Sequence, residues 1–234
     1  MKVIPKKRFL RRDLGTESPE AEKKRAAEIL KRLARRFPAA KIALRYSNPV
    51  QLMVAVILSA QCTDKKVNEV TAVLFKKYKT ARDFAKANLA VFEREIRPTG
   101  FFRMKARNII AACKILDLKY GGKLPRTMSE MLTLSGVARK SANVILGNAY
   151  GVVEGIAVDT HVMRISQRLG LTKFSDPVKI ERDLMALFKK NRWFDLTYKI
   201  IEHGRNICDA KKPKCSMCLL NDICPSAFNL PNWE

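Results

Sequence analysis

The sequence predicts an all-α protein, and three observations lead to this prediction. Apolar residues recur at helical spacing along most of the chain, as Val67, Val70, Leu74 and Tyr78 do. Helix-capping residues, prolines and glycines separate these segments. No convincing segment alternates polar and apolar residues as a half-buried strand would. The segment GVVEGIAV over 151–158 is short and flanked by glycine, so we interpret it as an extended connection.

Several helices are expected in the first half of the chain. Asn48 and Pro49 are typical of an N-cap and a first helical residue, and the segment QLMVAVILSAQ that follows is apolar on every side, which predicts a buried helix. Thr80 can cap a single helix over 81–96, which Pro98 ends. A further helix stops at the next pair of glycines, and its apolar stripe consists of Ile109, Ala112, Cys113, Leu116 and Tyr120.

The second half is expected to hold shorter helices and a division between domains. Helices are predicted over 128–134, 139–150 and 162–169, with two more starting at Pro177 and near Phe194. The connection between Gly151 and Gly155 is a plausible domain boundary. The N-terminal segment can then pack with the C-terminal part of the chain.

The charge of the chain favours a polyanionic partner. Lysine and arginine number 46 against 22 acidic residues, which gives a net charge of +24. Nucleic acid fits this excess, because lysine and arginine side chains that bind phosphates release the counterions condensed on the nucleic acid. An anionic membrane surface and a generally basic proteome are the competing explanations. The basic N-terminal segment MKVIPKKRFLRRDLG is either a solvated tail or an arm on the phosphate backbone. No secretory signal or transmembrane run is present, so we expect a soluble, cytoplasmic protein.

Four of the six cysteines lie close together near the C-terminus and indicate a metal centre. Cys208, Cys215, Cys218 and Cys224 form a C-x6-C-x2-C-x5-C array. Disulfides would need an oxidising compartment, which nothing in the N-terminus supports. Zinc and a [4Fe–4S] cluster both use four thiolates, and the spacing alone leaves both open. The two other cysteines are expected on apolar helix faces as core thiols.

The segment from Leu134 to Ile165 combines an amine, an acid and a turn. The turn LSGVA before a helix can present backbone N–H groups to a phosphate, or can be a plain connection between helices. Lys140 follows in the first helical turn, where the helix dipole and Arg139 disfavour its protonation, as attack on carbon requires. A surface lysine on a phosphate is the alternative. Asp159 suits an N-cap, a catalytic carboxylate, or both.

The loop between the first two clustered cysteines, DAKKPK, carries Lys211, Lys212 and Lys214. A solvated charge run is the usual explanation of such a segment. Because both ends of the loop would be tied to the metal centre, ordering these cations against phosphate costs less entropy, which favours a DNA contact.

Several motifs, in this order, resemble those of the endonuclease III family of the helix–hairpin–helix DNA glycosylase superfamily. They are LSAQCTD, TGFFRMKARNI, LSGVARKSANVIL, VDTHVMRISQRLGL and the cysteine array. The resemblance runs from about Ala43 to Pro225. It implies a helical domain over 42–152 and a second domain, formed by 1–41 and 153–234, around a [4Fe–4S] cluster. It also implies a DNA-binding cleft between the two domains.

By position, the resemblance assigns roles to individual residues. Lys140 is the Schiff-base nucleophile and Asp159 the catalytic carboxylate, while the four clustered cysteines bind the cluster. Gln61 would fill the space that the target base vacates, and Phe101 would wedge the duplex, although Phe101 could equally lie in the core. The residues expected to contact DNA are Gln61, Phe101, Gly136, Ala138, Arg139, Lys211, Lys212 and Lys214.

The implied function is base-excision repair. The enzyme would act as a monomer on duplex DNA with damaged bases or abasic sites, remove oxidised pyrimidines and cleave the strand by β-elimination, in association with a bacterial-type nucleoid. One alternative is a monofunctional adenine or mismatch-thymine glycosylase that uses water, although such relatives generally lack a lysine at position 140. Another is a DNA-binding or redox protein without catalysis, which would not require both Lys140 and Asp159.

The hairpin departs from the family pattern at two positions. The family sequence usually reads L-P-G-V-G, and here Ser135 and Ala138 replace the proline and the second glycine. If the second glycine needs a positive φ, alanine there costs about 1 kcal/mol. We expect altered affinity rather than lost function, because the backbone N–H groups remain.

Overall fold

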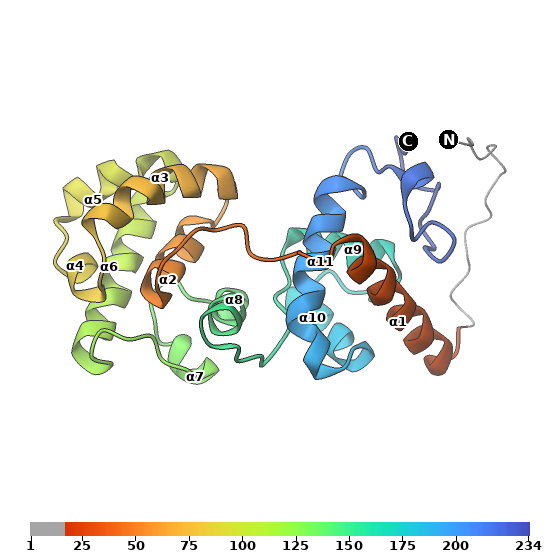
Figure 1. Ribbon diagram of the computed structural model, residues 1–234, viewed down its shortest axis with the longest axis horizontal. Helices are drawn as coiled ribbons and strands as arrows, with labels where there is room; N and C mark the ends of the chain where they lie inside the picture. Colours follow the sequence, from red (N-terminus) through yellow and green to blue (C-terminus); the bar gives the residue numbers. More distant parts are fainter. Residues whose placement is uncertain (1–16) are drawn as a thin grey trace. The chain divides into compact units, whose positions relative to one another are not determined.

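The structure is a computed structural model that describes residues 17–234 (Figure 1). The basic N-terminal arm, residues 1–15, therefore lies outside the described residues. Within them all regular secondary structure is helical, which confirms the all-α prediction. The chain divides into two compact units. We call Ile42–Glu154 the hairpin unit, and Gly155–Glu234 with the described part of Met1–Lys41 the terminal unit.

The hairpin unit is built around a fully buried helix. Its elements are α2 (Pro49–Leu58), α3 (Asp64–Lys77), α4 (Ala81–Ala85), α5 (Leu89–Ile96), the short 3-10 helix η1 (Arg97–Thr99), α6 (Phe102–Lys119), α7 (Met128–Met131) and α8 (Arg139–Tyr150). In α2 every residue from Val50 to Leu58 is buried, as predicted. Asn48 caps this helix, since its Oδ1 accepts a hydrogen bond from the Gln51 N–H at 3.0 Å.

The single helix expected over 81–96 is wrong, because the structure has α4 and α5 with a break between them. Thr80 and Asp83 form a capping box that starts α4. Asn88 caps α5 by accepting from the Val91 N–H at 3.2 Å. A short polar side chain that bonds to nearby backbone competes with a continuous helix, and this explains the break. The helix predicted over 128–134 likewise ends early, at Met131.

The terminal unit joins both ends of the described chain. Its elements are α1 (Pro19–Arg36), α9 (Thr160–Arg168), α10 (Pro177–Leu187), η2 (Lys190–Arg192), α11 (Trp193–Asn206) and η3 (Cys215–Met217). One face of α1 packs into an apolar core with residues of α9, α10 and α11 (Figure 1). Arg25 of α1 is buried, pairs with Glu17 at 2.8 Å and donates to the carbonyl groups of Leu169 at 2.5 Å and Gly170 at 3.1 Å. The first described helix is thus fastened to the end of α9.

Candidate active site and metal centre

The hairpin between α7 and α8 requires glycine at one position. The Val137 N–H donates to the Leu134 carbonyl at 3.1 Å, which closes a tight turn. Gly136 lies inside this turn with φ +78°, in the left-handed region that favours glycine. A Cβ at Gly136 would also stand 2.9 Å from the Cβ of Asn108 on α6. Close approach to α6 and backbone conformation therefore both exclude a side chain at this position.

Ala138 is not strained, contrary to the possibility raised by its replacement of glycine. Its φ of −90° and ψ of 170° are extended backbone that any residue adopts. The expected cost of about 1 kcal/mol for a positive φ therefore does not arise. Ala138 is the N-cap residue of α8 and offers no side-chain acceptor to the first helical turn. The helix thus begins without a capping side chain, a condition suited to binding an external anion.

Lys140 is the second residue of α8 and is exposed, while Arg139 before it is half-buried. Among the described residues no carboxylate forms an ion pair with Lys140, so its amine is accessible from solvent. The nucleophile predicted from the sequence therefore projects from the first turn of a helix, directly after the hairpin.

Asp159 belongs to the terminal unit and caps α9. Its Oδ1 accepts a hydrogen bond from the Val162 N–H at 2.8 Å, which confirms the N-cap role. The side chain is half-exposed, and within the described part of the chain Oδ2 has no hydrogen-bond donor. Capping therefore holds the carboxylate through one oxygen, while the second oxygen accepts no hydrogen bond from the described residues.

Gln61 and Phe101 are both exposed residues with left-handed backbone. Gln61 has φ +51° in the turn after α2, and Phe101 has φ +47° at the start of α6. Phe101 is 58% exposed, so it is not a core residue. Cys62, expected on a helix face, lies instead in the turn beside Gln61, whereas Cys113 is fully buried in α6 as expected.

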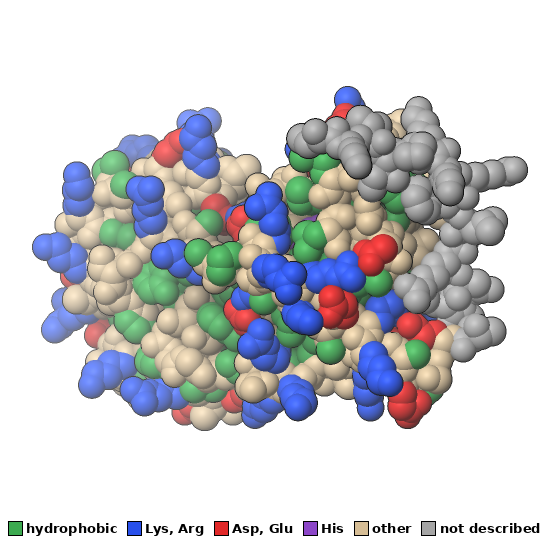
Figure 2. All heavy atoms as spheres, turned by 45° about the vertical axis from the view of Figure 1, so that its right-hand side comes forward, with side chains coloured by type: hydrophobic (Ala, Val, Ile, Leu, Met, Phe, Trp, Pro, Cys, Tyr) green, Lys and Arg blue, Asp and Glu red, His purple; other side chains and the backbone are tan. Residues whose placement is uncertain are grey.

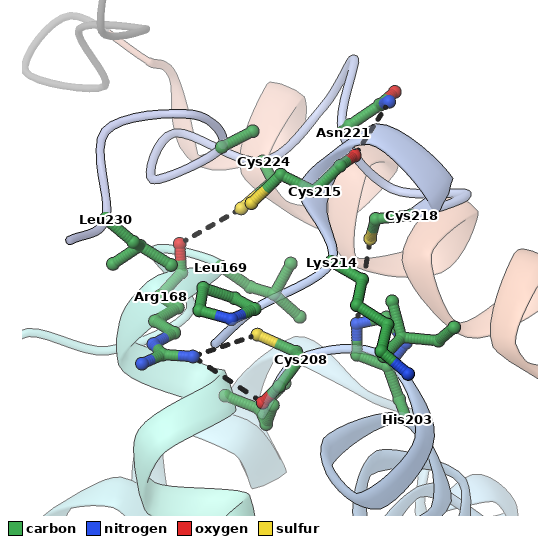
Figure 3. A pocket seen from close by; sticks show the side chains of 14 residues that line it. Arg168, Leu169, His203, Cys208, Lys214, Cys215, Cys218, Asn221, Cys224 and Leu230 are labelled. Atoms are coloured by element: carbon green, nitrogen blue, oxygen red, sulfur yellow. Dashed lines mark hydrogen bonds between the residues drawn. The ribbon is translucent and has the colours of Figure 1, made fainter. Parts of the chain in front are cut away.

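The four clustered cysteines line one pocket in the terminal unit (Figure 3). Burial raises the pKa of Cys218 to about 12 and that of Cys224 to about 11, and it also raises the pKa of Cys215. Buried thiols with such values keep their protons unless a metal cation takes their place. The four thiol groups face one pocket, and binding to iron would replace their protons. This arrangement fits a metal cluster.

A single zinc ion and an iron–sulfur cluster require different arrangements of four thiolates. No three His, Cys, Asp or Glu side chains from residue 17 onward are grouped closely enough to hold one metal ion. A zinc ion binds sulfur at about 2.3 Å and so needs its four ligands tightly gathered, whereas a cube of iron and sulfide holds them further apart.

Hydrogen-bond donors contact two of the four cysteine sulfur atoms, and neither the Arg168 nor the His203 side chain beside them was predicted from the sequence. Arg168 Nη1 donates to Cys208 Sγ at 3.3 Å (Figure 3). The Leu220 N–H donates to Cys218 Sγ at 3.4 Å. His203 Nε2 lies 3.8 Å from Cys218 Sγ, and burial lowers the pKa of His203 to about 4, so the ring is neutral. Donors of this kind orient thiolate ligands. Arg168 falls on the same helix as Asp159, but only the fold brings it to Cys208.

The lysine loop after Cys208 is held by backbone contacts. Arg168 donates to the carbonyl groups of Asp209 at 2.7 Å and Ala210 at 2.9 Å, and Asp209 Oδ1 accepts from the Lys211 and Lys212 N–H groups at 2.8 and 3.1 Å. Lys211, Lys212 and Lys214 are exposed. Figure 2 shows Lys and Arg side chains spread widely over the face in view, with fewer acidic side chains among them.

No helix in the described part of the chain is long and apolar enough to span a membrane.

Two family descriptions match the chain. Residues 54–190 match the HhH-GPD superfamily of base excision DNA repair proteins, and residues 208–224 match the iron-sulfur binding domain of endonuclease III. The second match begins at Cys208 and ends at Cys224, so it spans the four clustered cysteines and the residues between them.

Individual proteins match over most of the chain. It is 51% identical to endonuclease III of Synechocystis sp., over 88% of this chain and 94% of that protein, and 44% identical to endonuclease III of Bacillus subtilis, over 80% and 86%. A solved non-covalent endonuclease III–DNA complex is 42% identical, with a TM-score of 0.85 over 88% of this chain and 97% of that one. A trapped covalent endonuclease III–DNA intermediate matches with the same values.

Proposed function

Because the chain belongs to the endonuclease III family, and so is a DNA-binding glycosylase and AP lyase with a [4Fe–4S] cluster, we propose that it removes oxidised pyrimidines through Lys140 and Asp159. The observation that carries this proposal is the position of Lys140. An exposed amine stands in the first turn of α8, next to a hairpin whose backbone can hold the phosphate of the target strand. We further propose that the protein acts as a monomer on the nucleoid.

In this proposal Lys140 performs the chemistry on the sugar. Its neutral Nζ forms a bond to C1′ while the bond from C1′ to the base breaks, and the base leaves with a proton. Ring opening then gives an imine, which makes the C2′ proton acidic. Loss of that proton breaks the C3′–O bond and releases the 3′ strand with its 5′-phosphate, and water hydrolyses the imine to restore the amine. The Asp159 carboxylate stabilises the positive charge that develops on the sugar.

The base has to leave the stack before this reaction. Unstacking costs a few kcal/mol, and less where oxidation has weakened pairing or stacking. Gln61 would occupy the vacated space, and the exposed Phe101 ring would wedge between neighbouring bases. Their exposure on two turns supports these roles.

The remaining assignments concern phosphate contacts and the cluster. Backbone N–H groups from Gly136 to Ala138, with Arg139, would bind one phosphate, and the exposed lysine loop would bind another. The thiolates of Cys208, Cys215, Cys218 and Cys224 would hold the cluster, whose contribution is to fix that loop and the C-terminal segment. A plot of log affinity against log salt concentration has a negative slope. Replacing Lys211 by Gln is expected to make this slope less negative by about 0.9, because one phosphate contact is lost.

Borohydride trapping tests the proposal. A duplex with a single dihydrouracil is incubated with protein and borohydride, which reduces the imine to a stable covalent adduct. We expect an adduct with the wild type and with Lys114→Gln, an exposed lysine on α6 that serves as control, and background levels with Lys140→Gln. Asp159→Asn should slow adduct formation about a hundredfold.

Two outcomes would contradict the proposal. A full adduct yield from Lys140→Gln would remove Lys140 as nucleophile. Base release without strand cleavage or adduct would make the enzyme monofunctional. Comparing duplexes that contain dihydrouracil, 8-oxoguanine or a G·T mismatch separates a preference for oxidised pyrimidines from the other lesion classes.

A further inference from the structure

A buried lysine in the hairpin unit has no part in the chemistry above. Lys105 on α6 is 2% exposed, although burying a cation is costly unless polar groups surround it. Its Nζ donates to the Leu58 carbonyl at 2.7 Å and to the Thr99 carbonyl at 2.8 Å. These two acceptors are far apart in the sequence, so Lys105 joins two separate segments of the chain.

Both acceptors are the last residues of helices. Leu58 ends α2 and Thr99 ends η1. Carbonyl groups at a helix end lack partners within the helix, so a hydrogen-bond donor there satisfies them. Lys105 therefore caps two helix ends with one ammonium group.

Each capped end leads directly into a residue proposed to probe the duplex. Gln61 follows Leu58 by three positions, and Phe101 follows Thr99 by two. Both are non-glycine residues in the left-handed region, which persists only where the surrounding structure holds it. Both side chains are exposed, so their own packing does not fix these turns.

We propose that Lys105 is a positioning residue that sets the Gln61 and Phe101 turns in register, so that both side chains enter the duplex together. The inference rests on the proposed roles of Gln61 and Phe101. It depends on the two donated hydrogen bonds rather than on charge. Burial lowers the pKa of Lys105, and a neutral amine would still donate to both carbonyl groups.

The test compares two substitutions of equal length. Lys105→Met removes the donors, whereas Lys105→Gln keeps two N–H donors on a side chain one bond shorter than lysine. Binding is measured on a duplex with a tetrahydrofuran abasic analogue, from which no base can leave. We expect Lys105→Met to bind about tenfold more weakly than wild type, as loss of two buried hydrogen bonds implies, and Lys105→Gln to recover part of that loss.

A second buried lysine provides the matched control. Lys199 in the terminal unit is 3% exposed and pairs with Asp195, so Lys199→Met removes a buried cation from the unit that does not contain the two turns. Its affinity should stay within about twofold of wild type. Thermal unfolding is followed for every variant, and if Lys105→Met does not fold, the comparison of Lys105→Gln with wild type decides the matter.

A double-mutant cycle separates positioning from general damage. In a Gln61→Ala, Phe101→Ala background, Lys105→Met should weaken binding by less than about twofold further, since the residues it positions are gone. The fluorescence of 2-aminopurine beside the lesion, which rises on unstacking, should fall for Lys105→Met in the otherwise wild-type protein.

Three results would overturn the inference. Tight binding by Lys105→Met would remove any positioning role, and an undiminished loss in the doubly substituted background would make Lys105 merely structural. Wild-type affinity of the Gln61→Ala, Phe101→Ala protein would instead refute the proposed roles of these two residues. This outcome can be distinguished from a failure of the Lys105 proposal, because that protein keeps Lys105.

Discussion

The hairpin before α8 and the cysteine pocket of the terminal unit present polar groups in different ways. The hairpin is one contiguous segment, and the groups it offers are backbone N–H groups at a helix start. The pocket gathers side chains from α9, α11 and the C-terminal segment, and hydrogen-bond donors contact the sulfur atoms of Cys208 and Cys218. A backbone site should tolerate substitution wherever the new residue can adopt the main-chain conformation, as Ala138 does. A site made of side chains, such as the cysteine pocket, should lose its function when a single one of them is replaced.

Cys218→Ala is expected to show the largest effect, because it removes one of the four thiolates proposed to hold the cluster. The iron content should fall to near zero and the visible absorption should vanish, with destabilisation of the terminal unit. Iron analysis and absorption spectroscopy check this. Cys62→Ser, a cysteine outside the pocket, should keep its iron. A full iron content in Cys218→Ala would show that the pocket tolerates substitution as the hairpin does.

Gly136→Ala tests the one hairpin position where the backbone itself is constrained. The positive φ and the clash with Asn108 together should lower the free energy of unfolding by about 2 kcal/mol. Gly151→Ala is the matched control, because Gly151 has φ +66° but no atom within 4 Å of its added Cβ. Urea unfolding of both variants separates the two contributions. Equal losses would mean that the approach of α6 is unimportant.

Arg168→Met tests whether the pocket depends on a residue beyond its cysteines. The variant loses four hydrogen bonds from one guanidinium, to Cys208 Sγ and to the Cys208, Asp209 and Ala210 carbonyl groups, which should cost about 2 kcal/mol. We expect faster amide hydrogen exchange in the lysine loop and faster loss of the cluster during storage. Arg168→Lys should restore part of the protection. Unchanged exchange in Arg168→Met would show that other contacts hold the loop.

Ala138→Gly should have the smallest effect, because the φ of −90° suits both residues. The free energy of unfolding should change by less than about 1 kcal/mol, since glycine adds freedom to the unfolded chain but is a slightly better N-cap than alanine. DNA affinity should also change little. A large gain in either quantity would reveal strain at Ala138 that its backbone angles do not indicate.

The parts of the fold that the sequence could predict are those set by neighbouring residues. The side chains of Asn48, Asp159 and Asp176 each accept a hydrogen bond from the backbone N–H three residues later. Because this interaction is local, the start of each of these helices can be predicted from the sequence. The break at Asn88 was missed because apolar residues continue on both sides of it. The φ of Ala138 was also beyond sequence reasoning, since alanine is compatible with several backbone conformations.

Long-range contacts explain the rest of what sequence reasoning missed. Lys105 is one of 46 lysines and arginines in the sequence, and its burial depends on the convergence of two helix ends. His203 and Arg168 likewise contact cysteines that lie far along the chain. The candidate nucleophile and the cysteine array were identified because short motifs contain them.

The fastening of α1 to the end of α9 has a consequence for how the protein is made. The Arg25 guanidinium and the Leu169 carbonyl that it binds are 144 positions apart. On the ribosome α1 emerges before the other described helices of its unit. The whole hairpin unit, Ile42–Glu154, is then synthesised before the rest of the terminal unit. Domains fold as they emerge, so the amphipathic first helix has to wait unpartnered until the last part of the chain is synthesised. The order of synthesis and the order of assembly are therefore reversed for this helix.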